Sequence, residues 1–276
     1  MSKLSFNHIA GIALTAAVIS STANAGKLGL WDAEGWTDIT TAPTSGNPED
    51  WVSGSGYVDP GYGGQSFDAE YLLYKYDNAT NTLSIGLQTG FNIVDGHQVY
   101  SGKNYWTGDI ALSFNGATLG DSSSYEYAID FGLGQCGWSK RGNSTCGINN
   151  SQGLNDTAGI YQVTSWNNDI YFDGNPIGQA NSSPFAMQNG TEVVNALTSN
   201  NSGNGTVDGQ LSYFRQVSID LDLLGITDLS EIDVHWTMSC GNDAVNGSAS
   251  VPEPSAFGLF SLSLLGMGLL RVRAKK

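Results

Sequence analysis

The stretch that decides the fold class runs from residue 232 to residue 240 and reads Ile232-Asp233-Val234-His235-Trp236-Thr237-Met238-Ser239-Cys240. Large apolar side chains and Cys240 occupy every second position, and polar side chains stand between them. A period of two is typical of a β-strand with one face on a core. The pattern predicts a strand that buries Trp236 and turns His235 to the surface.

Similar runs recur along the chain between residues typical of turns, which predicts an all-β fold, an antiparallel β-sandwich with long loops. The strongest predicted strands cover residues 67–76, 83–91, 108–114, 125–131, 159–166 and 211–221, with weaker candidates at 185–188 and 192–197. Residues 221–226 read as a single helical turn. Residues 40–64 read as a long loop, and residues 199–206, rich in Asn, Ser and Gly, as a turn or mobile loop.

The N-terminal segment has the pattern of a secretory signal peptide. Lys3 precedes an apolar run over residues 9–19, and Ala23-Asn24-Ala25 is an A-x-A cleavage site. We therefore expect residues 1–25 to be removed, with the mature chain starting at Gly26. The exported domain then spans residues 26–243, and the small residues 244–250 are predicted to form a linker.

The C-terminal residues 251–276 have three parts. Pro252, Glu253 and Pro254 come first, residues 256–270 are uncharged and mostly apolar, and the chain closes with Arg271, Arg273, Lys275 and Lys276. An apolar run followed by cations is a stop-transfer pattern, so residues 256–270 are expected to form a hydrophobic transmembrane helix.

This tail resembles the PEP-CTERM sorting signal of Gram-negative bacteria. The resemblance implies processing by an exosortase, a membrane enzyme thought to cut near the motif. It also implies transient contact with the inner membrane and delivery to the cell surface or the extracellular polysaccharide of a biofilm. An ordinary single-span anchor is the alternative, although 15 residues is short for a span, which needs about 20.

Charge narrows the possible partners. Residues 26–250 hold 25 acidic and six basic residues, a net charge of −19. Nucleic acid and anionic membrane surfaces attract cationic proteins, so both are poor partners. Neutral sugars, cations and cationic polymers remain compatible with this charge, which also keeps a secreted protein soluble.

Cysteines and carboxylates offer two hypotheses about structure. Export permits disulfides, and Cys136 with Cys146 is the preferred pair, which leaves Cys240 over. A structural Ca²⁺ site is a second hypothesis, because Ca²⁺ takes carboxylate and carbonyl oxygens and the strand ends here are rich in Asp and Asn. Its candidate ligands are Asp68, Glu70, Asp109 and Asp243.

Catalytic motifs are sparse in the exported body. It contains two histidines, His97 and His235, and no G-x-S-x-G motif. The glycine pattern at residues 132–137 continues as loop-like sequence rather than as the helix that a dinucleotide site needs. Paired carboxylates keep a secreted glycoside hydrolase as the less favoured alternative.

Aromatic side chains provide the remaining binding hypothesis, since exposed Trp and Tyr stack on sugar rings. Candidate glycan-binding residues are Trp51, Tyr57, Tyr62 and Trp106. The body resembles exported regions of other PEP-CTERM proteins at residues 67–70, 108–112, 125–127 and 235–243. The first three segments are also loosely similar to carbohydrate-binding sandwich modules, which implies a jelly roll. We expect a non-enzymatic surface or matrix protein with a structural or adhesive role, or a carbohydrate-binding module.

Overall fold

The computed structural model describes residues 26–41, 64–100, 102–118, 121–134, 157–168, 170, 183–241 and 243–251. The predicted signal peptide, the Pro252–Pro254 sorting motif with its hydrophobic segment, the Cys136–Cys146 pair and the aromatic residues Trp51, Tyr57 and Tyr62 lie outside these ranges. None of the helices in the described ranges is both long enough and apolar enough to cross a membrane.

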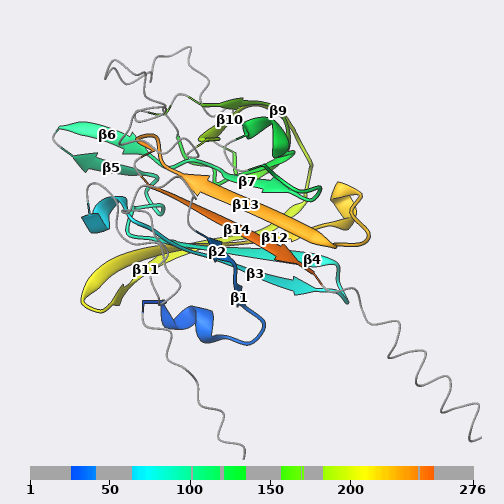
Figure 1. The fold of residues 1–276 in the computed structure, drawn as a ribbon, viewed down its shortest axis with the longest axis horizontal. Helices are drawn as coiled ribbons and strands as arrows, with labels where there is room; N and C mark the ends of the chain where they lie inside the picture. The colour runs from blue at the N-terminus through cyan, green and yellow to red at the C-terminus, as the bar shows by residue number, and fades with distance from the viewer. Residues whose placement is uncertain are drawn as a thin grey trace, which may run out of the picture.

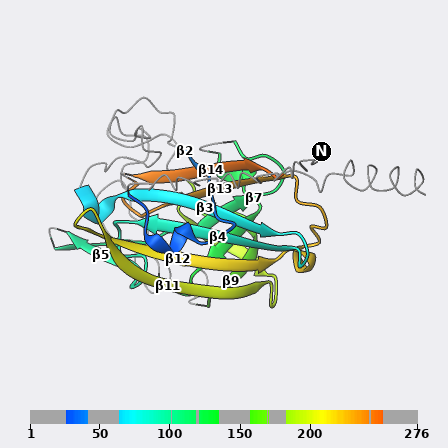
Figure 2. The ribbon, with the colours of Figure 1, turned by 90° about the horizontal axis from the view of Figure 1, so that it is seen from below.

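Two antiparallel sheets face each other, which confirms the predicted all-β, sandwich-like character (Figures 1 and 2). The five-stranded sheet has the order β1 (Thr37–Asp38), β3 (Ala69–Asp77), β4 (Thr82–Thr89), β12 (Gln210–Asp220) and β11 (Leu197–Val207). The seven-stranded sheet has the order β10 (Ala186–Glu192), β9 (Gly159–Asn167), β8 (Tyr127–Asp130), β7 (Ile110–Ser113), β13 (Glu231–Thr237), β14 (Ala244–Ser250) and β2 (Thr40–Thr41).

The remaining elements are short. Strands β5 (His97–Tyr100) and β6 (Lys103–Trp106) form a separate hairpin. Single 3-10 turns are η1 (Gly29–Asp32), η3 (Gly64–Phe67), η4 (Ser122–Ser124) and η5 (Asp222–Leu224). The last of these confirms the helical turn predicted within residues 221–226.

The main core lies between the two sheets. Strands β3, β4 and β12 supply Leu72, Ile85 and Val217 to it, among others. The alternation that predicted the last strand is confirmed, because its apolar positions all join this core: Ile232, Val234, Trp236, Met238 and Cys240. Burial of each large aliphatic side chain stabilises the fold by about 1.5–3 kcal/mol.

The middle of the seven-stranded sheet is also covered on its other face, which corrects the expected position of His235. This side chain is fully buried rather than on the surface. The segment Ser183–Phe185 crosses the sheet here: the Pro184 carbonyl oxygen lies 3.1 Å from His235 Nε2, and the Phe185 carbonyl accepts the Asp109 N–H at 3.1 Å. Alternating apolar and polar residues predict a strand, but they do not show whether other residues cover its polar face, as they do at His235.

Two segments predicted as loop or linker are strands. Residues 199–206 belong to β11, joined to β12 by an Asp208-Gly209 turn with positive φ at both residues, as a tight hairpin requires. The predicted linker 244–250 is β14, which pairs with all seven residues of β13. Small residues are needed there, because a Cβ on Gly247 would lie 2.7 Å from Ile39 Cδ1.

The N-terminal segment packs on the outer face of the five-stranded sheet. Trp31 lies over Gly86, where an added Cβ would approach its ring to 2.6 Å. Gln88 fixes this segment: its Oε1 accepts from Trp31 Nε1 at 2.7 Å and from the Leu28 N–H at 2.9 Å. Its Nε2 donates to the Gly26 carbonyl at 2.9 Å and to Glu70. The side-chain amide of Gln88 therefore provides hydrogen-bond partners for the backbone of the N-terminal segment and for the indole N–H of Trp31.

We predict that Gln88→Ala lowers the free energy of unfolding by about 3 kcal/mol, because it opens a cavity and leaves the buried Trp31 N–H without its acceptor. Urea unfolding followed by tryptophan fluorescence measures the change. The control is Gln210→Ala, at an exposed position of the same sheet, with an expected loss below about 0.5 kcal/mol. Equal losses in the two variants would show that Gln88 does not hold the N-terminal segment.

Candidate functional site

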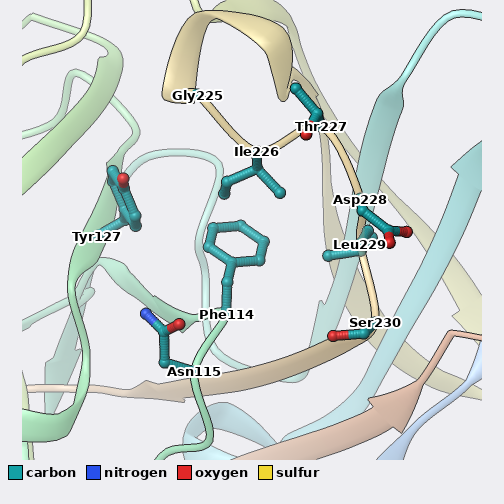
Figure 3. A pocket seen from close by; sticks show the side chains of 9 residues that line it. All are labelled: Phe114, Asn115, Tyr127, Gly225, Ile226, Thr227, Asp228, Leu229 and Ser230. Atoms are coloured by element: carbon teal, nitrogen blue, oxygen red, sulfur yellow. The ribbon is translucent and has the colours of Figure 1, made fainter.

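A hollow of about 340 Å³ opens at one end of the sandwich (Figure 3). This is within the range of volumes that small-ligand pockets occupy. We call it the end pocket. It is lined by Phe114, Asn115, Tyr127, Gly225, Ile226, Thr227, Asp228, Leu229 and Ser230.

One wall of the end pocket is the loop 225–230, which is anchored on both sides. Gly225 ends η5 in the left-handed conformation, with φ of 75°, and the Ile226 N–H returns to the Leu221 carbonyl at 3.0 Å. From the β3–β4 turn, Asn81 Nδ2 donates to the Ile226 carbonyl at 2.7 Å and to Asp222 Oδ1 at 2.6 Å. These bonds give the wall a fixed shape before any ligand arrives.

The opposite wall is aromatic. Strand β7 ends and strand β8 begins here, with Leu112 opposite Tyr127 in the ladder, and Phe114 follows directly after β7. The Phe114 and Tyr127 rings pack edge to face with centroids 5.6 Å apart. Both rings are half-buried, so each keeps a surface open at the pocket (Figure 3).

Carboxylates dominate the electrostatics around the end pocket. Glu126 holds the rim by accepting from the Phe114 N–H at 3.3 Å and from Asn115 Nδ2 at 3.1 Å. Burial, followed by the Glu126 charge, raises the pKa of Tyr127. Burial, followed by the charges of Asp228, Asp222 and Asp77, also raises the pKa of nearby Tyr76. None of the nine lining residues is basic, so the pocket favours neutral or cationic ligands over anions.

The end pocket lies beside the point where the chain leaves the sandwich. Ser250 pairs with Glu231 at the last position of the β13–β14 ladder, and the Val251 N–H then donates to the Ser230 carbonyl at 2.8 Å. Ser230 also lines the pocket. The predicted sorting motif follows Val251 in the sequence, so the pocket lies at the end of the domain where the described chain stops.

The carboxylates predicted to bind calcium are all buried, and the structure brings three of the four to one corner. Asp243 Oδ2 accepts the Ala69 N–H at 2.6 Å, so it lies beside Asp68 and Glu70 at the start of β3. Asp109 is directed instead to the Met187 N–H, 2.7 Å from its Oδ2. The described residues contain no group of three or more His, Cys, Asp or Glu side chains arranged to hold a metal ion. The calcium site stays a prediction.

Glu70 has a hydrogen-bond environment made of side chains. Its Oε1 accepts from Ser212 Oγ and Gln65 Nε2, both at 2.8 Å, and Gln88 Nε2 donates to its Oε2. Burial raises the pKa of Glu70, and these three hydrogen bonds lower it by a smaller amount. Glu70, on β3, therefore connects η3, β4 and β12 at a cost in desolvation.

The two other singled-out side chains also have packing roles. His235 Nδ1 lies 2.7 Å from Asn246 Oδ1, and its Nε2 faces the Pro184 carbonyl, which can only accept a hydrogen bond. Trp106 lies beside His97, with ring centroids 5.4 Å apart, and packs against the buried cluster of Ile170, Phe185 and Ala186. Its half-buried ring is placed in β6, away from the end pocket, and its role in glycan binding stays a prediction.

Sequence reasoning missed the end pocket because Phe114 and Tyr127 continue the apolar alternation of their strands and so read as core. The sequence feature that could have indicated the pocket is an aromatic residue next to a strand end, Phe114 and Tyr127, together with the short turn at residues 221–226 that contains Gly225. Comparison with known protein families, with curated proteins and with solved structures gives no match for this chain. The site must therefore be interpreted from its own geometry.

We predict that Glu70→Gln stabilises the protein increasingly as the pH rises from about 4.5 to neutrality. A carboxyl with a raised pKa in the folded state binds its proton more tightly there than in the unfolded chain. Its contribution to stability is therefore full at low pH and is lost as the pH rises through the folded pKa. Urea unfolding of both proteins across this pH range measures the difference.

The control is Gln210→Ala, at an exposed position without an ionisable group, and its difference from the wild type should stay nearly constant with pH. A Glu70→Gln difference that is also constant, or that reverses in direction, would contradict the assignment of Glu70 as a desolvated carboxylate.

Proposed function

We propose that this chain is an exported, exosortase-processed protein of the cell surface or extracellular matrix, with a structural or adhesive role in exopolysaccharide or biofilm. The observation that carries the proposal is that the end pocket lies at the end of the domain where the described chain stops. Val251, the residue before the Pro252–Pro254 motif, donates to Ser230, which lines the pocket. The signal peptide, the hydrophobic C-terminal helix over residues 256–270 and the Cys136–Cys146 disulfide belong to this proposal.

The second candidate is a carbohydrate-binding module, with the jelly roll that such a module implies. The end pocket favours it through two half-open aromatic rings, Phe114 and Tyr127, next to Asn, Asp, Thr and Ser side chains that exchange hydrogen bonds with hydroxyl groups. The surrounding carboxylates favour a neutral or amino sugar. If the protein is such a module, it would adhere to the matrix by binding a sugar in the end pocket.

The glycoside hydrolase is the third candidate, and the geometry favours it less. Hydrolysis needs two carboxyl groups that face a sugar across a cleft. Asp109 and Asp243, the fully buried members of the predicted set, accept backbone N–H groups inside the sandwich, and Glu70 accepts from three side chains. A binding role needs only the end pocket.

We predict that Tyr127→Ala weakens glycan binding about tenfold, because it removes one of two stacking surfaces while leaving the anchored loop 225–230. Calorimetric titration with cello-, manno- and chitosan oligosaccharides measures the affinity. Tyr100→Ala is the control, since Tyr100 is an exposed aromatic residue on the β5–β6 hairpin and should leave the affinity unchanged. Equal affinity of all three proteins would exclude the end pocket as the binding site.

We predict that replacing Pro252, Glu253 and Pro254 together with Ala leaves an unprocessed, membrane-held precursor in a bacterium that contains an exosortase. Immunoblots of membrane and secreted fractions follow the full-length chain. Ser255→Ala, next to the motif, should mature normally. Normal maturation of the triple variant would reduce the tail to an ordinary anchor.

A further inference from the structure

Strand β11 is an edge of the five-stranded sheet. It spans 11 residues and pairs on one side with β12, over residues 197–207 and 210–219. Among the described residues, no strand pairs with its other side. Figure 2 shows β11 as the outermost strand of this sheet.

The hydrogen bonds of the neighbouring strands determine which residues of β11 face outward. The Asp220 N–H donates to the Ala196 carbonyl, whereas the Leu221 N–H donates to Asn81 on the other side of β12. Because backbone groups alternate in direction along a strand, the even-numbered residues of β12 bond to β11. Their partners in the ladder are the odd-numbered residues 199 to 207. Residues 200, 202, 204 and 206 of β11 therefore direct their N–H and C=O groups to the open edge.

Three of these outward residues form a palindrome around Ser202: Asn200, Ser202 and Asn204. A second β11 that runs antiparallel and is centred on Ser202 would place Asn opposite Asn and Ser opposite Ser. A two-fold axis requires a self-complementary edge of this kind.

The edge also lacks the features that keep sheet edges apart. Proteins protect exposed edges with charged side chains or proline. Residues 197–207 contain no charged residue and no proline. The absence of charge is notable in a body whose residues 26–250 carry a net charge of −19. The bulge of this strand lies at its first residues, between Leu197 and Ser199, and leaves the ladder from residue 199 to residue 207 regular.

We propose that β11 pairs antiparallel with β11 of a second copy of this chain, centred on Ser202, so that two five-stranded sheets become one continuous sheet. The three outward residues around Ser202 on each strand would exchange about six hydrogen bonds. The pairing goes beyond the proposed function and does not involve the end pocket. It supplies a way for a matrix protein to join its copies.

A second copy fits this edge better than a strand from another protein, because only the same sequence repeats the palindrome. The acidic bodies of two copies repel each other, while the paired strands carry no charge. Dissolved salt screens that repulsion over about 10 Å at 0.1 M, so the dimer should strengthen as the salt concentration rises.

The first test is the oligomeric state of the protein produced from the full-length chain, measured by sedimentation equilibrium over a range of concentrations. We expect a dimer for the wild type and for Ser202→Ala. Ser202→Pro removes an outward N–H while leaving the β12 ladder intact, so we expect a monomer with at least tenfold weaker association and an unchanged unfolding midpoint. A wild type that is monomeric up to its solubility limit would overturn the proposal, as would equal dimerisation of the Pro and Ala variants.

The second test determines the register. In the proposed dimer the two copies of residue 202 form a directly opposed pair, about 5.5 Å apart between Cα atoms, which a disulfide can span. The two copies of residue 204 are about 14 Å apart. Ser202→Cys should therefore cross-link two chains under mild oxidation, and Asn204→Cys should cross-link no faster than the wild type. Equal cross-linking of the two variants would overturn the register centred on Ser202.

Discussion

The central strands of the seven-stranded sheet, β7, β8 and β13, bury side chains on both faces, and this constraint determines where the polar side chains beside them go. A buried polar group that lacks a hydrogen bond costs about 1–3 kcal/mol, so each must find a partner nearby. Asp243 meets the requirement by accepting the Ala69 N–H of the opposite sheet at 2.6 Å, and Asp109 by accepting the Met187 N–H. His235 contacts Asn246 and Pro184. Side chains that resembled metal ligands or catalytic groups in the sequence thus connect strands inside the sandwich.

Because these groups are occupied in the interior, chemistry available to partners lies at the ends and edges of the sheets. The end pocket forms where β7 ends, β8 begins and the loop 225–230 closes over Phe114 and Tyr127. It lies next to the chain exit at Val251. The outer edge of β11 lies on the other sheet and presents backbone groups rather than a cavity. Under these proposals, one surface would bind a sugar and the other a second copy, which is the combination that a matrix component would need.

The sequence predicted the strands that carry their own apolar alternation. Strands β3, β4, β12 and β13 were found in this way, and the apolar residues of β13 join the core as expected. Strands β11 and β14 were not found, because their residues are small or polar and they form on ladders supplied by β12 and β13. These two strands are stabilised by pairing with their neighbours, so the strand propensity of their own residues does not predict them.

The same limit applies to the candidate site. The period of two placed Phe114 and Tyr127 on core faces, but it could not show that the opposing layer ends beside them. It also could not show that Asn81, more than 140 residues away in sequence, anchors the loop that faces them through Asp222 and Ile226. Of the aromatic residues predicted to bind glycan, Trp106 lies in the described part of the chain, where it packs against the buried cluster of Ile170, Phe185 and Ala186.

The central claim is that the end pocket is the surface through which this protein contacts its matrix. The most direct measurement is an NMR titration of the isotope-labelled protein with neutral and amino-sugar oligosaccharides. We expect amide shifts that saturate and are confined to residues 114–115, 127 and 225–230. Saturating shifts centred on Trp106 instead, or binding that leaves the loop 225–230 unperturbed, would contradict this claim.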